Sequence, residues 1–228
     1  MRSMLDIEEM LEGYALLDQL HRSIASNEEE AERIASEIVT RYHYDYGLFT
    51  MAAFSLAKLR LQKKIYNDTI GLVTQIESNR PDSIMLDDYL SAELAFVKAQ
   101  ALEGVNDMAD GRANYVQALH YANQSFNTPL SRRIMLHLAT LECAQENPEE
   151  ARRLFDELLA TASPYEPGVT ASALIQRAQM ALVDRDRSKI KELLLLAMDM
   201  GWKSRGVCSN SQDLWDASAR ILELASQG

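Results

Sequence analysis

The chain contains few of the features on which secreted domains and membrane proteins depend. Its only two cysteines, Cys143 and Cys208, lie 65 positions apart and form no motif with each other or with a histidine. No apolar run reaches the roughly 18 residues that a transmembrane helix requires. Residues 1–19 mix charged with apolar side chains, unlike a secretory signal. These absences predict a protein of a reducing compartment, and the cytoplasm is the expected location.

Motifs for catalysis and for binding metals or phosphates are also missing. The nine glycines are scattered singly, so neither the G-x-G-x-x-G pattern nor the P-loop pattern occurs. The four histidines form no H-E-x-x-H motif. Cys143 follows His137 by six residues on one predicted helix, which directs the two side chains to different sides. We therefore expect a buried structural thiol, and we predict no enzyme activity, no metal site and no cofactor.

Basic side chains are fewer than acidic ones. The sequence has 23 basic and 34 acidic side chains, and the resulting net charge is −11. Residues 1–46 alone hold 11 acidic and 4 basic side chains. Such a surface repels phosphate backbones and anionic lipids, so we expect neither nucleic acid nor membrane insertion. The simplest interpretation of the acidity is a solvated, solubilising surface.

Helical periodicity is abundant, and it extends over almost the whole chain. Apolar residues recur at helical spacing, and no segment alternates as a strand would. The five prolines all fall between the apolar stripes, where they interrupt no helix. Capping residues precede several stripes, as in Thr128-Pro129, Asn147-Pro148 and Ser26-Asn27. The sequence thus predicts an all-α chain of about eleven helices.

A small residue recurs at one position of every second predicted helix. In the clearest example Ala151 is followed by Phe155 four residues later and then by Leu158 and Leu159, and the segment from Gly111 repeats this order. Successive small positions are separated by 38, 42, 40 and 39 residues. Recurrence at a fixed period is typical of stacked supersecondary units. The aligned positions are Ala31, Thr69, Gly111, Ala151 and Ile190, and the last of these departs from the pattern because isoleucine is not small.

This pattern resembles the tetratricopeptide repeat, whose second helix carries a small residue, an aromatic residue and an alanine–leucine step. In that family the first helix has a small residue where the two helices touch. The period here exceeds the usual period of about 34 residues, and no unit carries the family's tryptophan, which indicates a longer-period variant. The alternative is a non-repetitive helical bundle with the same stripes. The matching small residues of the first helices are Ala57, Ala99, Ala139 and Ala178.

The resemblance implies a single domain over residues 1–228, an all-α, right-handed superhelical solenoid of about five antiparallel helix pairs. The pairs are expected near residues 4–43, 46–80, 84–124, 129–162 and 168–201. A capping helix is expected over residues 211–226, where Trp215 and Leu224 would seal the exposed end of the core.

The resemblance also implies that the first helices line a concave groove, which holds a peptide or a helix of a partner protein. A groove that recognises a free peptide carboxylate needs several basic residues, whereas Lys58 and Arg133 here have Glu93 and Glu103 nearby. Such recognition is therefore not expected. The groove residues are expected to be Phe54, Lys58, Phe96, Gln100, Arg133, Thr140 and Gln179.

Two functions follow from this resemblance. One is a non-catalytic scaffold for protein–protein interaction, namely an adaptor, a chaperone or an assembly factor. The other is a regulatory or sensor module of a larger signalling or transcription-regulating protein. In both cases the partner is another protein, and a homo-oligomer is compatible with the sequence as well.

Aromatic residues are few, and they are densest at residues 42–49, between the first two pairs. Aromatic rings serve both to pack a turn between helix pairs and to anchor partners, and packing is the favoured interpretation here. On the repeat pattern we also expect Phe155 to be buried between the fourth and fifth pairs.

Overall fold

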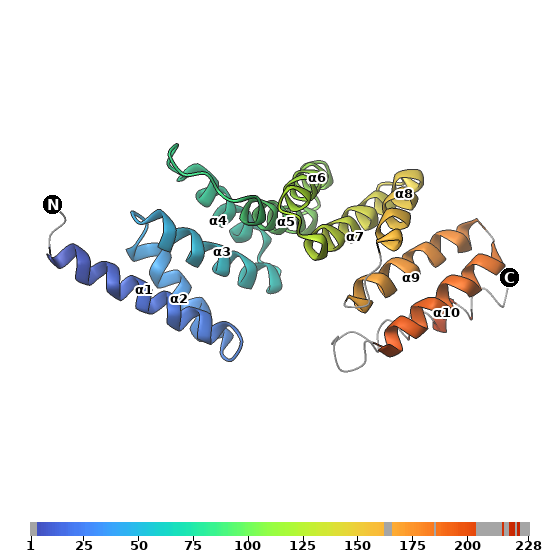
Figure 1. The fold of residues 1–228 in the computed structure, drawn as a ribbon, viewed down its shortest axis with the longest axis horizontal. Coiled ribbons are helices and arrows are strands. Elements are labelled where there is room, and N and C mark those ends of the chain that lie inside the picture. The colour runs from blue at the N-terminus through green and yellow to red at the C-terminus, as the bar shows by residue number, and fades with distance from the viewer. Residues whose placement is uncertain are drawn as a thin grey trace. The chain divides into compact units, whose positions relative to one another are not determined.

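The computed structural model describes residues 4–161, 166–184 and 186–203, together with Asp216, residues 219–221 and Glu223. Residues 4–203 of this part form ten helices, and Asp216, residues 219–221 and Glu223 are helical as well. No strand occurs among the described residues, and the all-α prediction is confirmed (Figure 1). None of these helices is both long and apolar enough to cross a membrane. The helices are α1 (Met4–Ile24), α2 (Glu28–Arg41), α3 (Tyr46–Gln62), α4 (Tyr66–Ser78), α5 (Asp88–Gly104), α6 (Met108–Gln124), α7 (Thr128–Ala144), α8 (Pro148–Ala160), α9 (Pro167–Val183) and α10 (Arg187–Lys203).

The helices fall into two compact units. The first unit is Met1–Tyr121 and the second is Ala122–Gly228, so the division lies within α6. The single domain expected over residues 1–228 stays a prediction.

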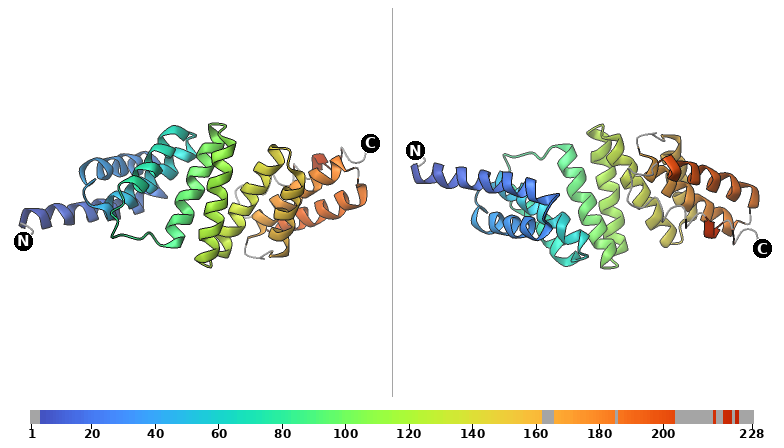
Figure 2. Two further views of the ribbon diagram at one scale, coloured as in Figure 1. Left: turned by 90° about the horizontal axis from the view of Figure 1, so that it is seen from above. Right: turned by 90° about the horizontal axis from the view of Figure 1, so that it is seen from below.

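Within each unit the helices pack as antiparallel pairs. In the first unit α1 packs on α2 and α3 on α4, and in the second unit α7 packs on α8 and α9 on α10. The pair α9 and α10 is seen side by side in both views of Figure 2. The first helices of neighbouring pairs also adjoin, α1 with α3, α3 with α5, and α7 with α9. This arrangement is the predicted stacking of helix pairs.

Small residues allow the two helices of a pair to approach each other. The Thr69 hydroxyl of α4 donates to the Ala57 carbonyl of α3 at 3.4 Å. A Cβ atom placed on Gly111 of α6 would lie 3.5 Å from the Ala99 carbonyl oxygen of α5. The small residues predicted at these contacts, Ala57, Ala99, Ala139 and Ala178, are all fully buried. A larger side chain at these positions would force the helices apart, because protein interiors are close-packed.

The long repeat period has a simple geometric origin. Helices α5, α6 and α7 each contain 17 residues, and the turns between them contain three residues, 105–107 and 125–127. A helix and its turn therefore occupy 20 residues, and a pair occupies 40. The extra length, relative to the usual period of about 34 residues, lies mainly in the helices.

Each of four such tight turns contains a residue in the left-handed conformation. Lys64, Asn106, Phe126 and Glu146 have φ values of 60°, 65°, 54° and 57°. At the α5–α6 turn the Asn106 amide donates to the Glu103 carbonyl at 2.9 Å, and the Asp107 amide donates to the Leu102 carbonyl at 2.8 Å. This bonding is the Schellman arrangement, which satisfies the last carbonyl groups of a helix.

The capping predictions are partly corrected. Asn27 caps α2 as expected, since its side chain accepts from the Glu30 amide at 3.2 Å. At α7 the cap is Asn127 and not Thr128, because Asn127 accepts from the Leu130 amide at 3.0 Å. Asn147 precedes α8, but its side-chain amide donates to Glu142 at 2.9 Å and caps nothing. A carboxylate one turn back competes there for the asparagine side chain.

The core of the first unit is built where α1, α2 and α3 meet. Leu17, Leu20, Ile34 and Ile38 are buried there with Tyr42. Gly13 of α1 has no side chain at this contact, and a Cβ atom on it would lie 2.7 Å from the nearest side-chain atom of Leu48. The glycine therefore brings the α1 backbone close to the α2–α3 turn.

Phe155 is fully buried on α8, which packs against both α7 and α9, so its predicted burial is confirmed. The expected capping helix at residues 211–226 lies largely outside the described residues, and so do Trp215 and Leu224. Of that segment, Ile221 is buried in the cluster formed with α9 and α10.

Candidate functional site

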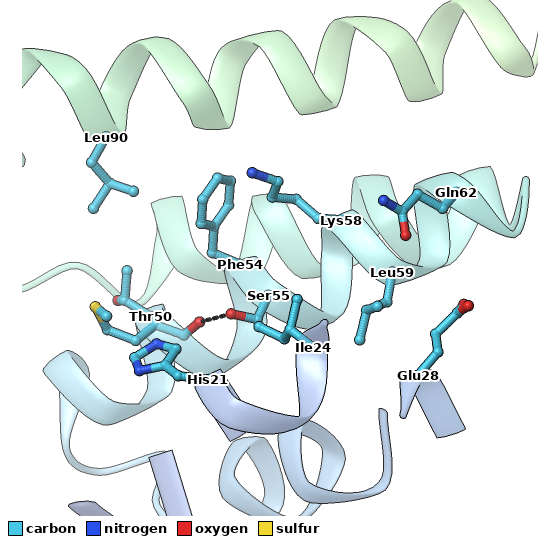
Figure 3. A pocket seen from close by; sticks show the side chains of 11 residues that line it. His21, Ile24, Glu28, Thr50, Phe54, Ser55, Lys58, Leu59, Gln62 and Leu90 are labelled. Atoms are coloured by element: carbon cyan, nitrogen blue, oxygen red, sulfur yellow. Dashed lines mark hydrogen bonds between the residues drawn. The ribbon is translucent and has the colours of Figure 1, made fainter. Parts of the chain in front are cut away.

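A pocket of about 370 Å³ lies along α3 in the first unit, and we call it the α3 pocket. Four lining residues of α3, Met51, Phe54, Lys58 and Gln62, follow one another at three- or four-residue spacing, which places them on one helix face. The remaining walls come from α1, α2 and α5, as Figure 3 shows. The full lining is His21, Ile24, Glu28, Thr50, Met51, Phe54, Ser55, Lys58, Leu59, Gln62 and Leu90.

The walls of the α3 pocket are mainly apolar, and its polar groups lie at defined places. Met51 and Ile24 are 46% and 42% exposed, so the apolar surface reaches solvent. The Ser55 hydroxyl donates to the Met51 carbonyl at 2.9 Å, the bond dashed in Figure 3. The Thr50 hydroxyl is buried without a hydrogen-bond partner. A buried hydroxyl without a hydrogen-bond partner destabilises the fold. The Thr50 hydroxyl is therefore a polar group of the pocket whose hydrogen-bonding capacity is not used.

A charged group stands beside the aromatic wall. The Lys58 ammonium lies 5.2 Å from the centre of the Phe54 ring, within the range of a cation–π contact. The same ammonium lies 3.6 Å from the Glu93 carboxylate of α5. The Tyr89 hydroxyl donates to Glu93 at 3.4 Å. Lys58 thus joins α3 to α5, and half of its side chain remains exposed to solvent.

The structure brings together two of the predicted groove residues, Phe54 and Lys58. It places Phe96 elsewhere: the ring is only 2% exposed, and its centre lies 6.0 Å from that of Tyr115. Phe96 holds the repeat position on α5 that Phe54 holds on α3, but Tyr115 of α6 covers it. Phe96 therefore belongs to the core. Gln100 is half-buried on α5 and is not among the residues that line the pocket.

The other predicted groove residues lie in the second unit. Arg133 is exposed on α7, and the Thr140 hydroxyl donates to the Leu136 carbonyl of its own helix at 2.8 Å. Gln179 of α9 lines a separate pocket of about 570 Å³. Since Phe96 is buried, it lines no groove. A groove that runs through the other predicted residues stays a prediction.

That second pocket also contains the cysteine that we expected to be buried. Cys143 is half-buried, and its Sγ atom lies 3.9 Å from the sulfur of Met180. Burial raises the pKa of the thiol above its ordinary value, which disfavours the reactive thiolate. Within the part of the chain that the structure describes, no three potential ligand side chains gather as a metal site.

Sequence reasoning missed the contribution of α1 to the α3 pocket. His21 and Ile24 line the pocket from the end of that helix. The predicted groove residues start at Phe54 in the second pair, and none of them lies in the first pair. The only signal in the sequence was an apolar residue, Ile24, just before the predicted cap of the next helix at Ser26-Asn27.

Comparison with solved structures identifies the same architecture. BtubC (BKLC) from P. vanneervenii aligns over 91% of this chain and 90% of its own, with a TM-score of 0.60 and 14% sequence identity. At this identity the likeness concerns the fold alone. The fold is a repeat of helical hairpins. A TPR-repeat protein from Bacteroides fragilis, BF2334, aligns over 93% of this chain and 98% of its own, with a TM-score of 0.40 and 11% identity.

No protein-family model matches the chain, and no curated protein matches it by sequence. The helical-hairpin architecture is therefore supported by the paired helices, by their small-residue contacts and by the structural alignment with BtubC. The α3 pocket lies on the side formed by the first helices α1, α3 and α5 of that architecture.

Proposed function

We propose that the chain is a non-catalytic binding scaffold that holds a segment of a partner protein against α1, α3 and α5. The observation that supports this proposal is the α3 pocket, in which an apolar cavity opens beside Lys58 and Glu93. An apolar side chain of the partner would enter the cavity, and the partner's backbone would meet the half-exposed Lys58 ammonium. Buried apolar anchors surrounded by polar groups are where protein interfaces concentrate their binding energy.

The role proposed is that of an adaptor, a chaperone or an assembly factor, and its proposed location is the cytoplasm. A free thiol such as that of Cys143 is typical of proteins in reducing compartments. The net charge of −11 disfavours nucleic acid as the partner.

The experiment compares substitutions at two positions of the first unit whose side chains are equally exposed. Met51 in the α3 pocket and Val116 on α6 are both 46% exposed. Met51→Glu places a charge in the cavity, whereas Val116→Glu places the same charge on a second helix. We expect affinity capture from the source cell to lose the partner with Met51→Glu and to retain it with Val116→Glu, with both variants folded by circular dichroism.

Two further variants separate binding from packing. Phe54→Ala should weaken capture and lower the melting temperature less than Phe96→Ala does, because Phe54 is half-buried and Phe96 is buried. The proposal is wrong if folded Met51→Glu and Lys58→Glu variants both capture the partner as well as the unaltered chain does.

A further inference from the structure

A second hollow in the first unit lies apart from the α3 pocket and shares no residue with it. Its volume is about 660 Å³, and we call it the Tyr44 hollow. Its walls come from α1, from the α2–α3 turn with the start of α3, and from the α4–α5 loop. The lining residues are Glu9, Met10, Tyr44, Asp45, Tyr46, Gly47, Pro81 and Ile84.

The aromatic part of the Tyr44 hollow is held in place and open to solvent. Tyr44 is 61% exposed, and its ring packs against His43 and Tyr42, with ring centres 5.8 and 6.3 Å apart. Burial, together with the neighbouring Glu9 carboxylate of α1, raises the pKa of the Tyr44 hydroxyl above its ordinary value. The Tyr46 hydroxyl donates to the Ile76 carbonyl at 3.2 Å, which fixes the second tyrosine. An exposed aromatic ring that is fixed before binding loses little conformational entropy when a ligand stacks on it.

The charges of the Tyr44 hollow all have one sign. Glu9 and Asp45 carry carboxylates, and none of the described residues that line the hollow is basic. One Asp45 oxygen accepts from the Leu48 amide at 3.1 Å. Arg41, close by in sequence, is already held by Glu12 at 3.0 Å and by Glu37 at 2.9 Å. The surrounding unit has 20 acidic and 11 basic side chains, a net charge of −9.

The rest of the lining is apolar. Met10 and Pro81 face the hollow together with Ile84, which is 39% exposed. The neighbouring Met85 is 91% exposed. Gly47 adds no side chain, so the backbone at the start of α3 stays accessible. A partner that fits this surface carries a cation on an aliphatic stem, with apolar residues beside it.

We propose that the Tyr44 hollow is a docking site for an arginine-bearing segment of another protein. The guanidinium group would stack on the Tyr44 ring and pair with the Glu9 and Asp45 carboxylates, and the flanking apolar residues would lie on Met10 and Ile84. Arginine fits better than lysine, because its planar guanidinium both stacks on aromatic faces and forms two hydrogen bonds to a carboxylate. This site is independent of the α3 pocket and of the function proposed for it.

The experiment uses the full chain, labelled with ¹⁵N, and a blocked pentapeptide with arginine between two leucines. A second peptide carries citrulline, which has the shape of arginine without its charge. We expect the arginine peptide to shift the amide resonances of residues 9–10, 44–47 and 81–85, and the citrulline peptide to leave them nearly unchanged.

Matched variants test the two carboxylates. Glu9→Gln removes the charge and keeps the size of the side chain, and Asp45→Asn keeps a helix cap, since asparagine caps as well as aspartate. Each should weaken binding of the arginine peptide by roughly fivefold or more, because a charge-assisted hydrogen bond is lost. Glu8→Gln removes the same charge from an exposed neighbour that does not line the hollow, and it should change the affinity by less than about twofold.

Three results would overturn the proposal. One is the absence of shifts at the Tyr44 hollow with the arginine peptide. Another is equal binding of the citrulline peptide, which would indicate a purely apolar contact. The third is an equal loss of affinity in Glu8→Gln and Glu9→Gln, which would indicate general attraction to an acidic surface.

Discussion

At the scale of single residues, the five phenylalanines have contrasting environments that the sequence pattern alone does not distinguish. Phe155 and Phe96 are buried, whereas Phe126 is 92% exposed at the α6–α7 turn. Phe126 also adopts the left-handed backbone conformation, with φ of 54°. Phenylalanine is therefore a core residue at some positions of this chain and a surface residue at another.

The first prediction uses this contrast. Phe155→Ala should lower the free energy of unfolding by about 3–5 kcal/mol, because it empties a fully buried aromatic site. Phe126→Ala is the control and should change the unfolding free energy by less than about 1 kcal/mol. Chemical denaturation of both variants checks the prediction, and equal effects would contradict the repeat packing around α8.

A buried cation is the other notable single residue. Arg132 of α7 is completely buried. It lies 2.7 Å from Glu166 and 2.9 Å from the Thr170 hydroxyl, both at the start of α9. Its Nε atom has no hydrogen-bond partner. The ion pair joins α7 to α9, but it leaves one buried donor of the guanidinium, Nε–H, without an acceptor.

The second prediction concerns this buried ion pair and the unpaired Nε atom of Arg132. Glu166→Ala leaves the buried guanidinium without its charge partner and should cost about 3 kcal/mol or more. Arg132→Met removes the charge and the orphaned nitrogen while it keeps most of the volume, so its cost should be smaller. Unfolding free energies measured at one pH decide between them. A larger loss in Arg132→Met would mean that the ion pair itself stabilises the fold.

At the scale of elements, ion pairs join the start of α2 to the end of α3. Glu32 contacts Lys63 and lies 2.8 Å from Arg60. The hydrogen bond from Lys63 holds the pKa of Glu32 below its ordinary value of 4.5, even though partial burial acts in the opposite direction. A carboxylate with a lowered pKa stabilises the folded state when it is ionised.

The third prediction concerns pH. Because the pKa of Glu32 is lower in the folded than in the unfolded chain, its contribution is present above the unfolded value and is lost as pH falls through the folded value. Glu32→Gln should therefore reduce the unfolding free energy by roughly 0.5–1 kcal/mol at pH 7, and the difference should shrink towards zero in acid. Denaturation at several pH values measures this, with Glu8→Gln as the control. A difference that is independent of pH would contradict the electrostatic origin.

At the scale of the whole molecule, helices account for the secondary structure throughout the described residues. The units differ in charge: the first unit has 20 acidic and 11 basic side chains, and the second has 14 and 12, which give −9 and −2. Both proposed binding surfaces lie in the more acidic first unit. A cationic partner segment would therefore meet a favourable field there at low salt.

The fourth prediction is spectroscopic. Far-ultraviolet circular dichroism of the full chain should indicate a strongly helical protein with negligible strand. More than about a tenth of strand would contradict the fold, since an average globular domain contains roughly 20–25%.

Local interactions allowed the sequence to determine the helices and the contacts between paired helices. Apolar spacing, proline positions and caps act within a few residues, so they predicted the all-α architecture. Small residues such as Ala99 and Gly111, and the buried Phe155, followed from the repeat register. The burial of Phe96 does not follow from its local sequence. It shares the register of Phe54, yet Tyr115 of the next helix covers it.

Only the tertiary structure decided which residues form the binding surfaces. The α3 pocket needs α1, α2, α3 and α5 at once, and the Tyr44 hollow joins residues as far apart as Glu9 and Ile84. Such surfaces depend on how helices approach one another, and that approach is set by packing between segments distant in sequence. Gly13 illustrates the point, because the missing side chain matters only through Leu48 and Tyr42, which the fold brings beside it. The periodic pattern specifies which face of each helix is buried, and the packing of these faces determines where a cavity remains.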